Sequence, residues 1–302
     1  YQDLIGFHAA DKNPTALVDA DLERLQFIKQ HATFKDKEDL YLETLKASQE
    51  KYKNNEVSGL YAFEIPQVYH QQANSYNAKT NTEPRFKNKE ALAICNSVIK
   101  KYPKSIGAKK CESLKQSILN ESLSITAEKY IPINKHSRLL INYKNIDELF
   151  FTAYKISFKE QEKLQRTHKE EDRIVFINKL KKVNSWNSKL RNENDYLQHT
   201  TEVVVPEIEQ GNYIIVATKY KELKATETYG TTFLQVTDLV LVENDFDAKN
   251  NYQVVDRNTG KPIQNATIHL KNEPNRRRNN PILDKTLTTN KNGFASFKSN
   301  QR

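Results

Sequence analysis

The spacing of apolar residues changes once along this chain, near Leu123, and the change limits the folds open to it. From Pro14 to about Asn120, apolar residues recur at three- and four-residue intervals, as on one face of an amphipathic helix. Beyond Leu123 they alternate with polar residues, as in strands with one buried face. We therefore predict a multidomain chain, helical first and β-rich afterwards, and its 302 residues suffice for two or three units.

The helical part is predicted to form antiparallel hairpins. Two early segments each place three apolar side chains on one face: Leu22, Leu25 and Ile28 in the first, and Leu40, Leu42 and Leu45 in the second. The clearest hairpin follows later, with one helix over residues 89–101 and another over Ile106–Leu119. Tyr102-Pro103 ends its first helix, because proline disfavours helix in the residue before it, and Ser105 can cap the second. This Tyr-Pro-x-Ser turn resembles a tetratricopeptide-type repeat.

An earlier segment is a less regular copy of this hairpin. Pro66 lies inside its second helix, predicted over residues 57–69, and either kinks that helix or marks a gap in the sequence. Residues 74–89 are rich in Asn, Thr and Lys, and we expect them to form an exposed loop between the two copies.

The chain has two cysteines, and both lie in the clearest hairpin. Cys95 is eight residues before Pro103 and Cys111 eight residues after it, so the two thiols are expected to face one another across the antiparallel helices. Two interpretations stay open: a pair of small buried side chains at the helix contact, or a disulfide, which requires an exported protein. A metal site is not expected, because no third or fourth ligand accompanies them.

The β-rich part is predicted to hold two antiparallel sandwich units behind a helical unit over residues 1–121. The first covers residues 122–238, with a helical segment inserted near residues 159–183, and the second, short enough to be incomplete, covers residues 239–302. A strand over residues 123–131 and a hairpin over residues 287–297 are among the expected elements. Gly260 and Gly293 lie where tight turns need a positive φ.

Three stretches, taken in order behind a helical region, resemble the N-terminal part of bacterial alpha-2-macroglobulin-like proteins. They are residues 125–134 with 138–151, residues 205–217, and residues 256–268 with 289–295. The resemblance covers essentially the whole chain. It implies immunoglobulin-like, macroglobulin-type β-sandwiches behind a tetratricopeptide-like preface, in an exported, periplasmic or outer-membrane-associated protein of a Gram-negative bacterium.

The resemblance also implies a function. It points to a non-catalytic structural and protein-interaction region of a longer protein, whose full-length form acts in protease trapping or envelope defence. Some family members trap proteases with a thioester in a Cys-x-x-Gln motif, but Cys95 precedes Asn-Ser-Val and Cys111 precedes Glu-Ser-Leu. We therefore expect no enzyme activity, no cofactor, and protein or peptide partners, among them proteases bound through the full-length protein. The alternative is a surface module that binds carbohydrate or nutrients for outer-membrane uptake, which exposed aromatics on one face would favour.

The remaining chemistry-bearing residues form no catalytic or metal-binding motif. Glu170-Glu171-Asp172 lies among lysines, which favours a solvated, ion-paired helix face. Residues 244–247 lack the glycine and the terminal glutamate of an EF-hand loop. The seven histidines are scattered and include no His-Glu-x-x-His pair: His8, His31, His70, His136, His168, His199 and His269.

The formal net charge of +9 makes nucleic acid a rival partner. The richest basic spots are Lys100-Lys101, Lys109-Lys110, residues 179–182 and residues 276–278, and they are dispersed, without the interleaved aromatics of a base-stacking surface. We therefore expect no nucleic-acid binding. We also expect no membrane span, because no apolar run reaches about 18 residues.

Overall fold

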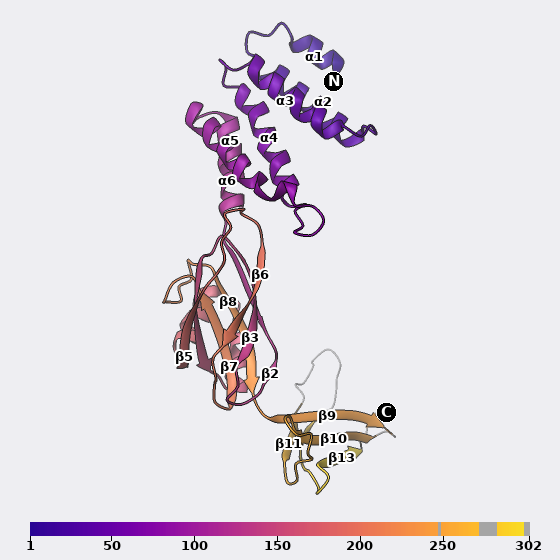
Figure 1. Ribbon diagram of the computed structural model, residues 1–302, viewed down its shortest axis with the longest axis vertical. Coiled ribbons are helices and arrows are strands. Elements are labelled where there is room, and N and C mark those ends of the chain that lie inside the picture. The colour runs from indigo at the N-terminus through magenta and orange to yellow at the C-terminus, as the bar shows by residue number, and fades with distance from the viewer. Residues whose placement is uncertain (247–248, 272–282, 299–302) are drawn as a thin grey trace. The chain divides into compact units, whose positions relative to one another are not determined.

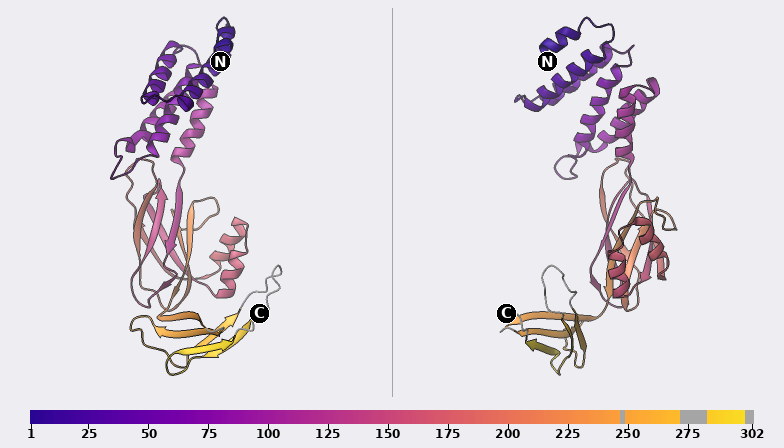
Figure 2. Two further views of the ribbon diagram at one scale, coloured as in Figure 1. Left: turned by 90° about the vertical axis from the view of Figure 1, so that its right-hand side faces the viewer. Right: turned by 180° about the vertical axis from the view of Figure 1, so that it is seen from behind.

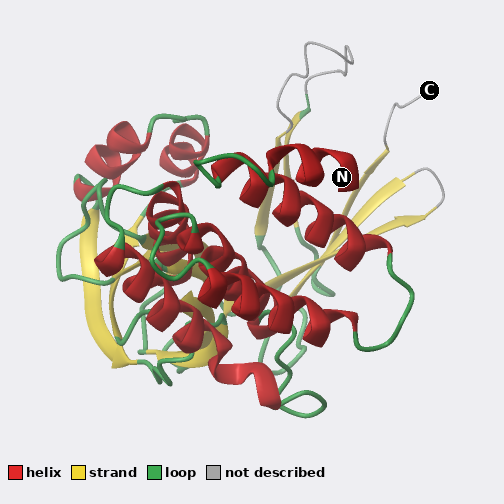
Figure 3. Ribbon diagram, turned by 90° about the horizontal axis from the view of Figure 1, so that it is seen from above, coloured by secondary structure: helices red, strands yellow, loops and turns green. Residues whose placement is uncertain are grey.

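The computed structural model describes residues 1–246, 249–271 and 283–298, except the side chains of residues 245–249 and 298. The chain forms two compact units. Unit 1 comprises residues 1–123 together with residues 142–148 and 189–201, and unit 2 comprises residues 124–141, 149–188 and 202–302. Helices come first and strands later (Figure 1), which confirms the predicted α-then-β order, and Figure 3 distinguishes the helices from the strands by colour. The boundaries predicted at residues 121 and 238 stay predictions.

Unit 1 is built from helices that pack on their neighbours in the chain. Its helices are α1 (Gln2–His8), α2 (Thr15–His31), α3 (Lys37–Lys51), α4 (Ser58–Ala73), the 3₁₀ helix η1 (Glu83–Phe86), α5 (Lys87–Lys101) and α6 (Ile106–Leu119). Helix α4 packs against α3, α5 and α6, so it lies at the centre of the unit (Figure 1).

Two apolar clusters share α4. One joins α4 to α2 and α3 and includes Leu22, Leu25, Leu42 and Leu45, and the other joins α4 to α5 and α6. Complete burial of a leucine such as Leu45 contributes about 1.5–3 kcal/mol. The sequence predicts six residues on the apolar faces of α2 and α3. Two of them, Ile28 and Leu40, are not buried in the core, since they are 39% and 50% exposed. On α3 the contact instead rotates by one residue, so that Tyr41 is buried in place of Leu40.

Pro66 does not end α4. The helix runs from Ser58 to Ala73 with Pro66 inside it, and ten of its residues, Pro66 included, are buried. Proline removes one backbone hydrogen bond and clashes with the preceding turn. Packing on three neighbouring helices therefore outweighs the local preference to break the helix.

The hairpin of α5 and α6 has the predicted turn. The hydroxyl of Ser105 accepts a hydrogen bond from the backbone N–H of Ala108 at 3.1 Å, which confirms it as the cap of α6. The predicted loop over residues 74–89 is too long, because Glu83 to Phe86 form η1 and α5 begins at Lys87. Pro84 and Asn88 are buried there, so tertiary contacts order the end of this polar segment.

The strands between residues 122 and 236 form two sheets. They are β1 (Ser122–Ala127), β2 (Tyr130–Ile131), β3 (Ser137–Lys144), β4 (Glu148–Lys155), β5 (Lys181–Lys189), β6 (His199–Val205), β7 (Gly211–Thr218) and β8 (Tyr229–Val236). One sheet has the order β1-β3-β6 and the other β2-β8-β7-β4-β5. Helices α7 (Phe158–Gln165) and α8 (Glu170–Asn178) cover one face of the five-stranded sheet through Leu164, Ile174 and Ile177 (Figure 2).

Three strand predictions need correction here. Residues 123–131 do not form one strand: the charged pair Glu128-Lys129 separates β1 from β2, and the two strands belong to different sheets. Strand β2 pairs in parallel with β8, so the sheet is mixed rather than antiparallel. The helical insertion ends before residue 181, because residues 181–189 form β5, an edge strand polar enough to escape the alternation pattern.

The described residues from 239 to 298 also form two small sheets. Their strands are β9 (Leu239–Phe246), β10 (Lys249–Asp256), β11 (Thr267–Lys271), β12 (Asp284–Thr288) and β13 (Phe294–Lys298), in the orders β13-β10-β9 and β11-β12. The predicted hairpin over residues 287–297 is therefore wrong. The buried hydroxyl of Thr289 donates to the carbonyl of Ile263 at 2.7 Å and accepts from the N–H of Ala266 at 2.8 Å, which ties the end of β12 to the β11 side. Gly260 and Gly293 have φ angles of 68° and 72°, as predicted for their turns.

Candidate functional site

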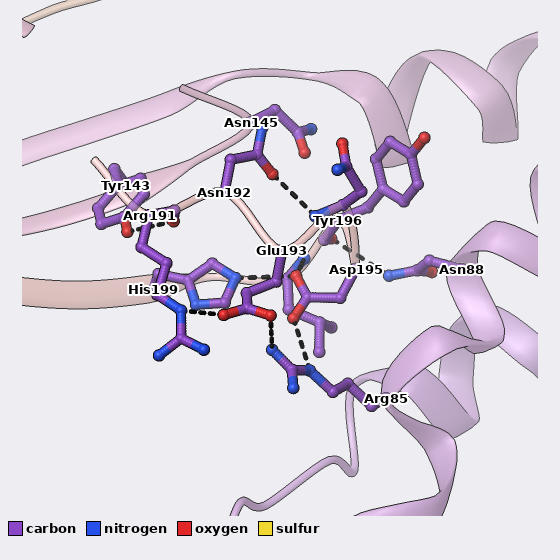
Figure 4. Close-up of polar contacts among 12 residues, drawn as sticks. Arg85, Asn88, Tyr143, Asn145, Arg191, Asn192, Glu193, Asp195, Tyr196 and His199 are labelled. Atoms are coloured by element: carbon purple, nitrogen blue, oxygen red, sulfur yellow. Dashed lines mark hydrogen bonds and ion pairs between the residues drawn. The ribbon is translucent and has the colours of Figure 1, made fainter. Parts of the chain in front are cut away.

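A network of polar side chains in unit 1 centres on a buried carboxylate, Asp195, which is 1% exposed (Figure 4). Its Oδ2 accepts a hydrogen bond from Nε of Arg85 at 3.1 Å. Its Oδ1 accepts from the backbone N–H of Leu197 at 3.2 Å and lies 2.8 Å from Nε2 of His199. The second arm of the Arg85 guanidinium reaches the carboxylate of Glu193 at 3.0 Å. One arginine from η1 thus binds two carboxylates, and one of these, Asp195, also pairs with a histidine.

The segment between β5 and β6 adopts an unusual backbone to make these contacts. Asn194 and Tyr196 have φ angles of 54° and 57°, a region that an aromatic residue rarely adopts. The helices of unit 1 hold the segment in place: Nδ2 of the buried Asn88 donates to the carbonyl of Tyr196 at 3.2 Å, and Oδ1 of Asn88 lies 2.7 Å from Nδ1 of His70. Side chains on α4 and α5 therefore support the strained loop.

A second loop of unit 1, residues 145–147, caps the end of α6. The Nδ2 amide of Asn145, whose φ is 57°, donates to the carbonyls of Ile118 and Asn120 at 2.9 and 3.2 Å. The Nζ of Lys144 donates to the carbonyl of Ser117 at 3.1 Å. The last carbonyls of a helix have no partner within it and carry partial negative charge, so an amide and an ammonium group stabilise this end.

The contacts of Asp195 define its chemistry. Burial raises the pKa of its carboxyl, but the hydrogen bonds from His199, the Leu197 N–H and Arg85 outweigh burial and hold the pKa below its ordinary value. Asp195 is therefore an ionised, fully engaged acceptor at neutral pH. His199 makes no hydrogen bond to a serine, threonine or cysteine of the described chain, so the Asp–His pair lacks the nucleophile of a hydrolytic triad. The network joins loops to helices.

A groove on the helices of unit 1 has a different character. It is a cavity of about 520 Å³ bounded by α2, α3 and α4. Its lining is mostly amide and charged: Gln26, Lys29, Gln30, Lys37, Glu38, Tyr41, Glu64, Gln67, Val68 and Gln71. A volume of this size is that of a typical ligand site, but such sites are usually mostly apolar.

Contacts across the groove order part of this lining. Lys29 of α2 donates to Oε1 of Gln71 on α4 at 3.3 Å, and its ammonium lies 5.0 Å from the ring centre of Tyr41. The Tyr41 hydroxyl donates to Glu64 at 3.3 Å. Burial, followed by the charge of Glu64, raises the pKa of the Tyr41 phenol, so it stays a hydrogen-bond donor at neutral pH.

Both cysteines lie in the core between α5 and α6. Cys95 and Cys111 are buried free thiols in one apolar cluster. The neighbouring Cys95 thiol and burial raise the pKa of Cys111, while the Cys111 thiol lowers the pKa of Cys95. The two thiols are therefore adjacent, and the disulfide stays a prediction.

This burial predicts low thiol reactivity. In the reduced, folded protein we expect neither Cys95 nor Cys111 to react with Ellman's reagent, because both have 0% exposure, and both to react after unfolding in guanidinium chloride. Rapid reaction of the folded protein would contradict the packing of α5 on α6. The same titration of unreduced protein distinguishes the two interpretations, since a disulfide leaves no free thiol even after unfolding.

Three of the remaining histidines each pair with a single carboxylate. His8, His136 and His269 pair with Asp11, Glu207 and Asp284, respectively, and the described residues contain no group of three metal-binding side chains. Glu170, Glu171 and Asp172 occupy the first turn of α8, where negative charge favours the helix.

Two of the basic spots, Lys100-Lys101 and Lys109-Lys110, lie in unit 1. In unit 1 the Lys101 ammonium donates to the carbonyl of Lys53 at 2.7 Å, and Lys110 lies over the Phe63 ring. Residues 276–278 lie outside the described residues, as do the side chains of residues 245–247. No helix in the described ranges is long and apolar enough to cross a membrane.

Comparison with known proteins gives little further definition. No protein-family model matches the chain, and no curated protein matches it in sequence. Among solved structures, a fragment of native alpha-2-macroglobulin from Escherichia coli spanning domains MG0-NIE-MG1 has a TM-score of 0.42 at 10% identity, over 59% of this chain and 58% of that one. A fragment spanning NIE-MG1 has a TM-score of 0.40 at 9% identity, over 60% and 88%. The CARDB domain of the PF1109 protein from Pyrococcus furiosus has a TM-score of 0.22 at 13% identity, over 39% and 88%.

Proposed function

We propose that this chain is a non-catalytic, partner-binding region of an exported bacterial alpha-2-macroglobulin-like protein, and that its partners are polypeptides. The observation that carries the proposal is the groove of unit 1, where three helices present hydrogen-bonding side chains around a cavity of about 520 Å³. Paired helices that stack along the chain bind peptides on such surfaces. The three sequence stretches that resemble the family, behind helical hairpins, support the assignment to an exported protein.

The chemistry of the Asp195 network supports a structural role. Each of its side chains acts on a loop or a helix end, and Asp195 itself has three donors. A rigid helical unit that presents a groove is what a binding region requires. Protease trapping or envelope defence is proposed for the full-length protein only, because neither Cys95 nor Cys111 lies in a thioester motif.

Binding of an unfolded polypeptide tests the proposal. Short fluorescein-labelled peptides that are unfolded in solution are titrated with the whole chain, and binding is followed by anisotropy. We expect saturable binding that is weakened by Gln67→Ala in the groove and unchanged by Gln116→Ala, which removes an exposed glutamine of α6 outside it. Absence of peptide binding would contradict the proposal.

A second candidate function has one observation in its favour. In unit 2, Trp186 stacks on Phe151 with ring centres 5.3 Å apart, beside a shallow pocket of about 270 Å³ that also includes Thr152, Ser185 and Lys182. An aromatic ring beside hydroxyl groups is a common surface for a sugar. Quenching or enhancement of Trp186 fluorescence by neutral oligosaccharides would favour the carbohydrate-binding alternative, and Trp is otherwise absent from the chain, so the signal is specific.

A further inference from the structure

The groove of unit 1 contains four glutamines in two matched pairs. Gln26 and Gln30 lie one turn apart on α2, and Gln67 and Gln71 lie one turn apart on α4, and all four line the same cavity. The amides of Gln26, Gln30 and Gln67 make no hydrogen bond within the described part of the chain, whereas that of Gln71 accepts from Lys29. Each amide offers two donors and one acceptor oxygen.

The spacing of these pairs matches an extended chain. Residues four apart on a helix are separated by about 6 Å along its axis. Alternate residues of an extended peptide, whose N–H and C=O groups point the same way, are separated by about 6.7 Å. One glutamine pair can therefore serve successive outward-facing peptide groups on one side of a bound strand, and the pair on the facing helix can serve the other side.

The rest of the lining offers little for side-chain recognition. Its apolar members are Val68, which is buried, and Tyr41, whose hydroxyl is already engaged with Glu64. Its charges cancel, because Lys29 and Lys37 are balanced by Glu38 and Glu64. The groove therefore contains no deep apolar pocket for an anchor residue and no net charge to select an acidic peptide, despite the +9 charge of the chain.

We propose that this groove recognises the main chain of an extended peptide through its glutamine side chains, with little regard to the peptide's sequence. The inference rests on the proposed function and adds the chemistry of recognition to it. Affinity then comes from hydrogen bonds to peptide N–H and C=O groups, as in the addition of a strand to a sheet edge, but with side-chain amides as partners. Sequence tolerance suits a region that must hold many different polypeptides.

Four labelled peptides test the inference against the whole chain: an extended parent peptide rich in Ser and Thr, a scrambled version, and two versions N-methylated at alternate residues, one in each register. Main-chain recognition predicts equal affinity for the parent and the scrambled peptide, and a loss of about tenfold on N-methylation in one register, as expected when one or two hydrogen bonds are lost. Affinity should change by less than about twofold between low and high salt, since the lining charges cancel.

The variant that removes all four amides, Q26A/Q30A/Q67A/Q71A, should lose about tenfold or more in affinity for the parent peptide. It should keep its helical circular dichroism, because alanine favours helix more than glutamine does. Gln116→Ala is the matched control and should bind as the unmodified chain does. Binding that is lost on scrambling but unaffected by N-methylation would overturn main-chain recognition and leave the proposed function standing. Failure of every peptide to bind would overturn the proposed function itself.

Discussion

Arg85→Ala is expected to lower the free energy of unfolding of unit 1 by about 3 kcal/mol, because it leaves the ionised Asp195 buried without its guanidinium partner. The side chains of Arg85 and Asp195 are 27% and 1% exposed, so the carboxylate depends on protein donors rather than on solvent in the folded chain. His199 and the Leu197 N–H remain as donors, which keeps the loss at the lower end of the range for broken buried pairs.

Two spectroscopic signals separate the units in this experiment. Trp186, the one tryptophan of the sequence, lies in unit 2, whereas most helical residues lie in unit 1. In a denaturant titration, Arg85→Ala should move the midpoint of the helical circular dichroism signal and leave the midpoint of tryptophan fluorescence unchanged. Arg191→Ala is the matched control: Arg191 contacts Glu193 but is 84% exposed, so its loss should cost less than about 1 kcal/mol. Equal effects of the two variants would contradict a central role for the buried pair.

The effect of Arg85→Ala should also depend on pH. The pKa of Asp195 is lower in the folded protein than in the unfolded chain, so its ionised form contributes stability above the unfolded value of about 3.9. That contribution is lost as the pH falls from there through the folded pKa. The stability difference between the unmodified protein and Arg85→Ala should therefore be constant near neutral pH and shrink below about pH 4.

Gly107→Ala is expected to destabilise unit 1 by about 3 kcal/mol, since it inserts a methyl group where α6 crosses α4 with the backbones in contact. A Cβ at Gly107 would lie 2.4 Å from the carbonyl oxygen and 2.5 Å from the carbonyl carbon of Gly59. Those atoms belong to the backbone of a buried helix, so no flexible side chain can move aside. The helices must separate, which disrupts the cluster around Cys95 and Cys111.

The same substitution in another helix provides the control. A Cβ at Gly6, in α1, would meet nothing within 4 Å. Gly6→Ala should therefore be neutral or stabilise by up to about 1 kcal/mol, since alanine favours helix over glycine. The midpoint of the helical circular dichroism signal should fall for Gly107→Ala and not for Gly6→Ala. Destabilisation by both variants would show that propensity or folding background, rather than the close contact with Gly59, controls the result.

Local sequence patterns predict which helices, strands and turns form better than they predict which strands pair with one another. The change of period near Leu123, the cap at Ser105 and the turns at Gly260 and Gly293 depend on residues close in sequence, and each is present in the structure. The β12–β13 hairpin and the single strand over residues 123–131 failed because sheet membership is decided by pairing with distant strands. A polar edge strand such as β5 has no alternation strong enough to reveal it.

The sequence contains almost no sign of the candidate sites, because their residues are distant in the chain and meet only in the folded structure. Arg85 and Asp195 are 110 residues apart, and each lies in a stretch that resembles an exposed polar loop. The only local sign was the Asn-rich run at residues 192–195, which favours turns and positive φ. The groove glutamines lie beside the leucine cluster and are not part of it, so a search for apolar periodicity passes over them.

The most direct test of a peptide-binding groove on unit 1 is a nitrogen–proton correlation spectrum of the whole chain, which resolves glutamine side-chain amides individually. On addition of an unfolded peptide, we predict that the amide signals of Gln26, Gln30, Gln67 and Gln71 shift together and saturate at one concentration, while that of Gln116 does not move. Shifts that instead centre on the indole signal of Trp186, or that leave the groove amides unchanged while the peptide binds, would contradict a peptide-binding groove on unit 1.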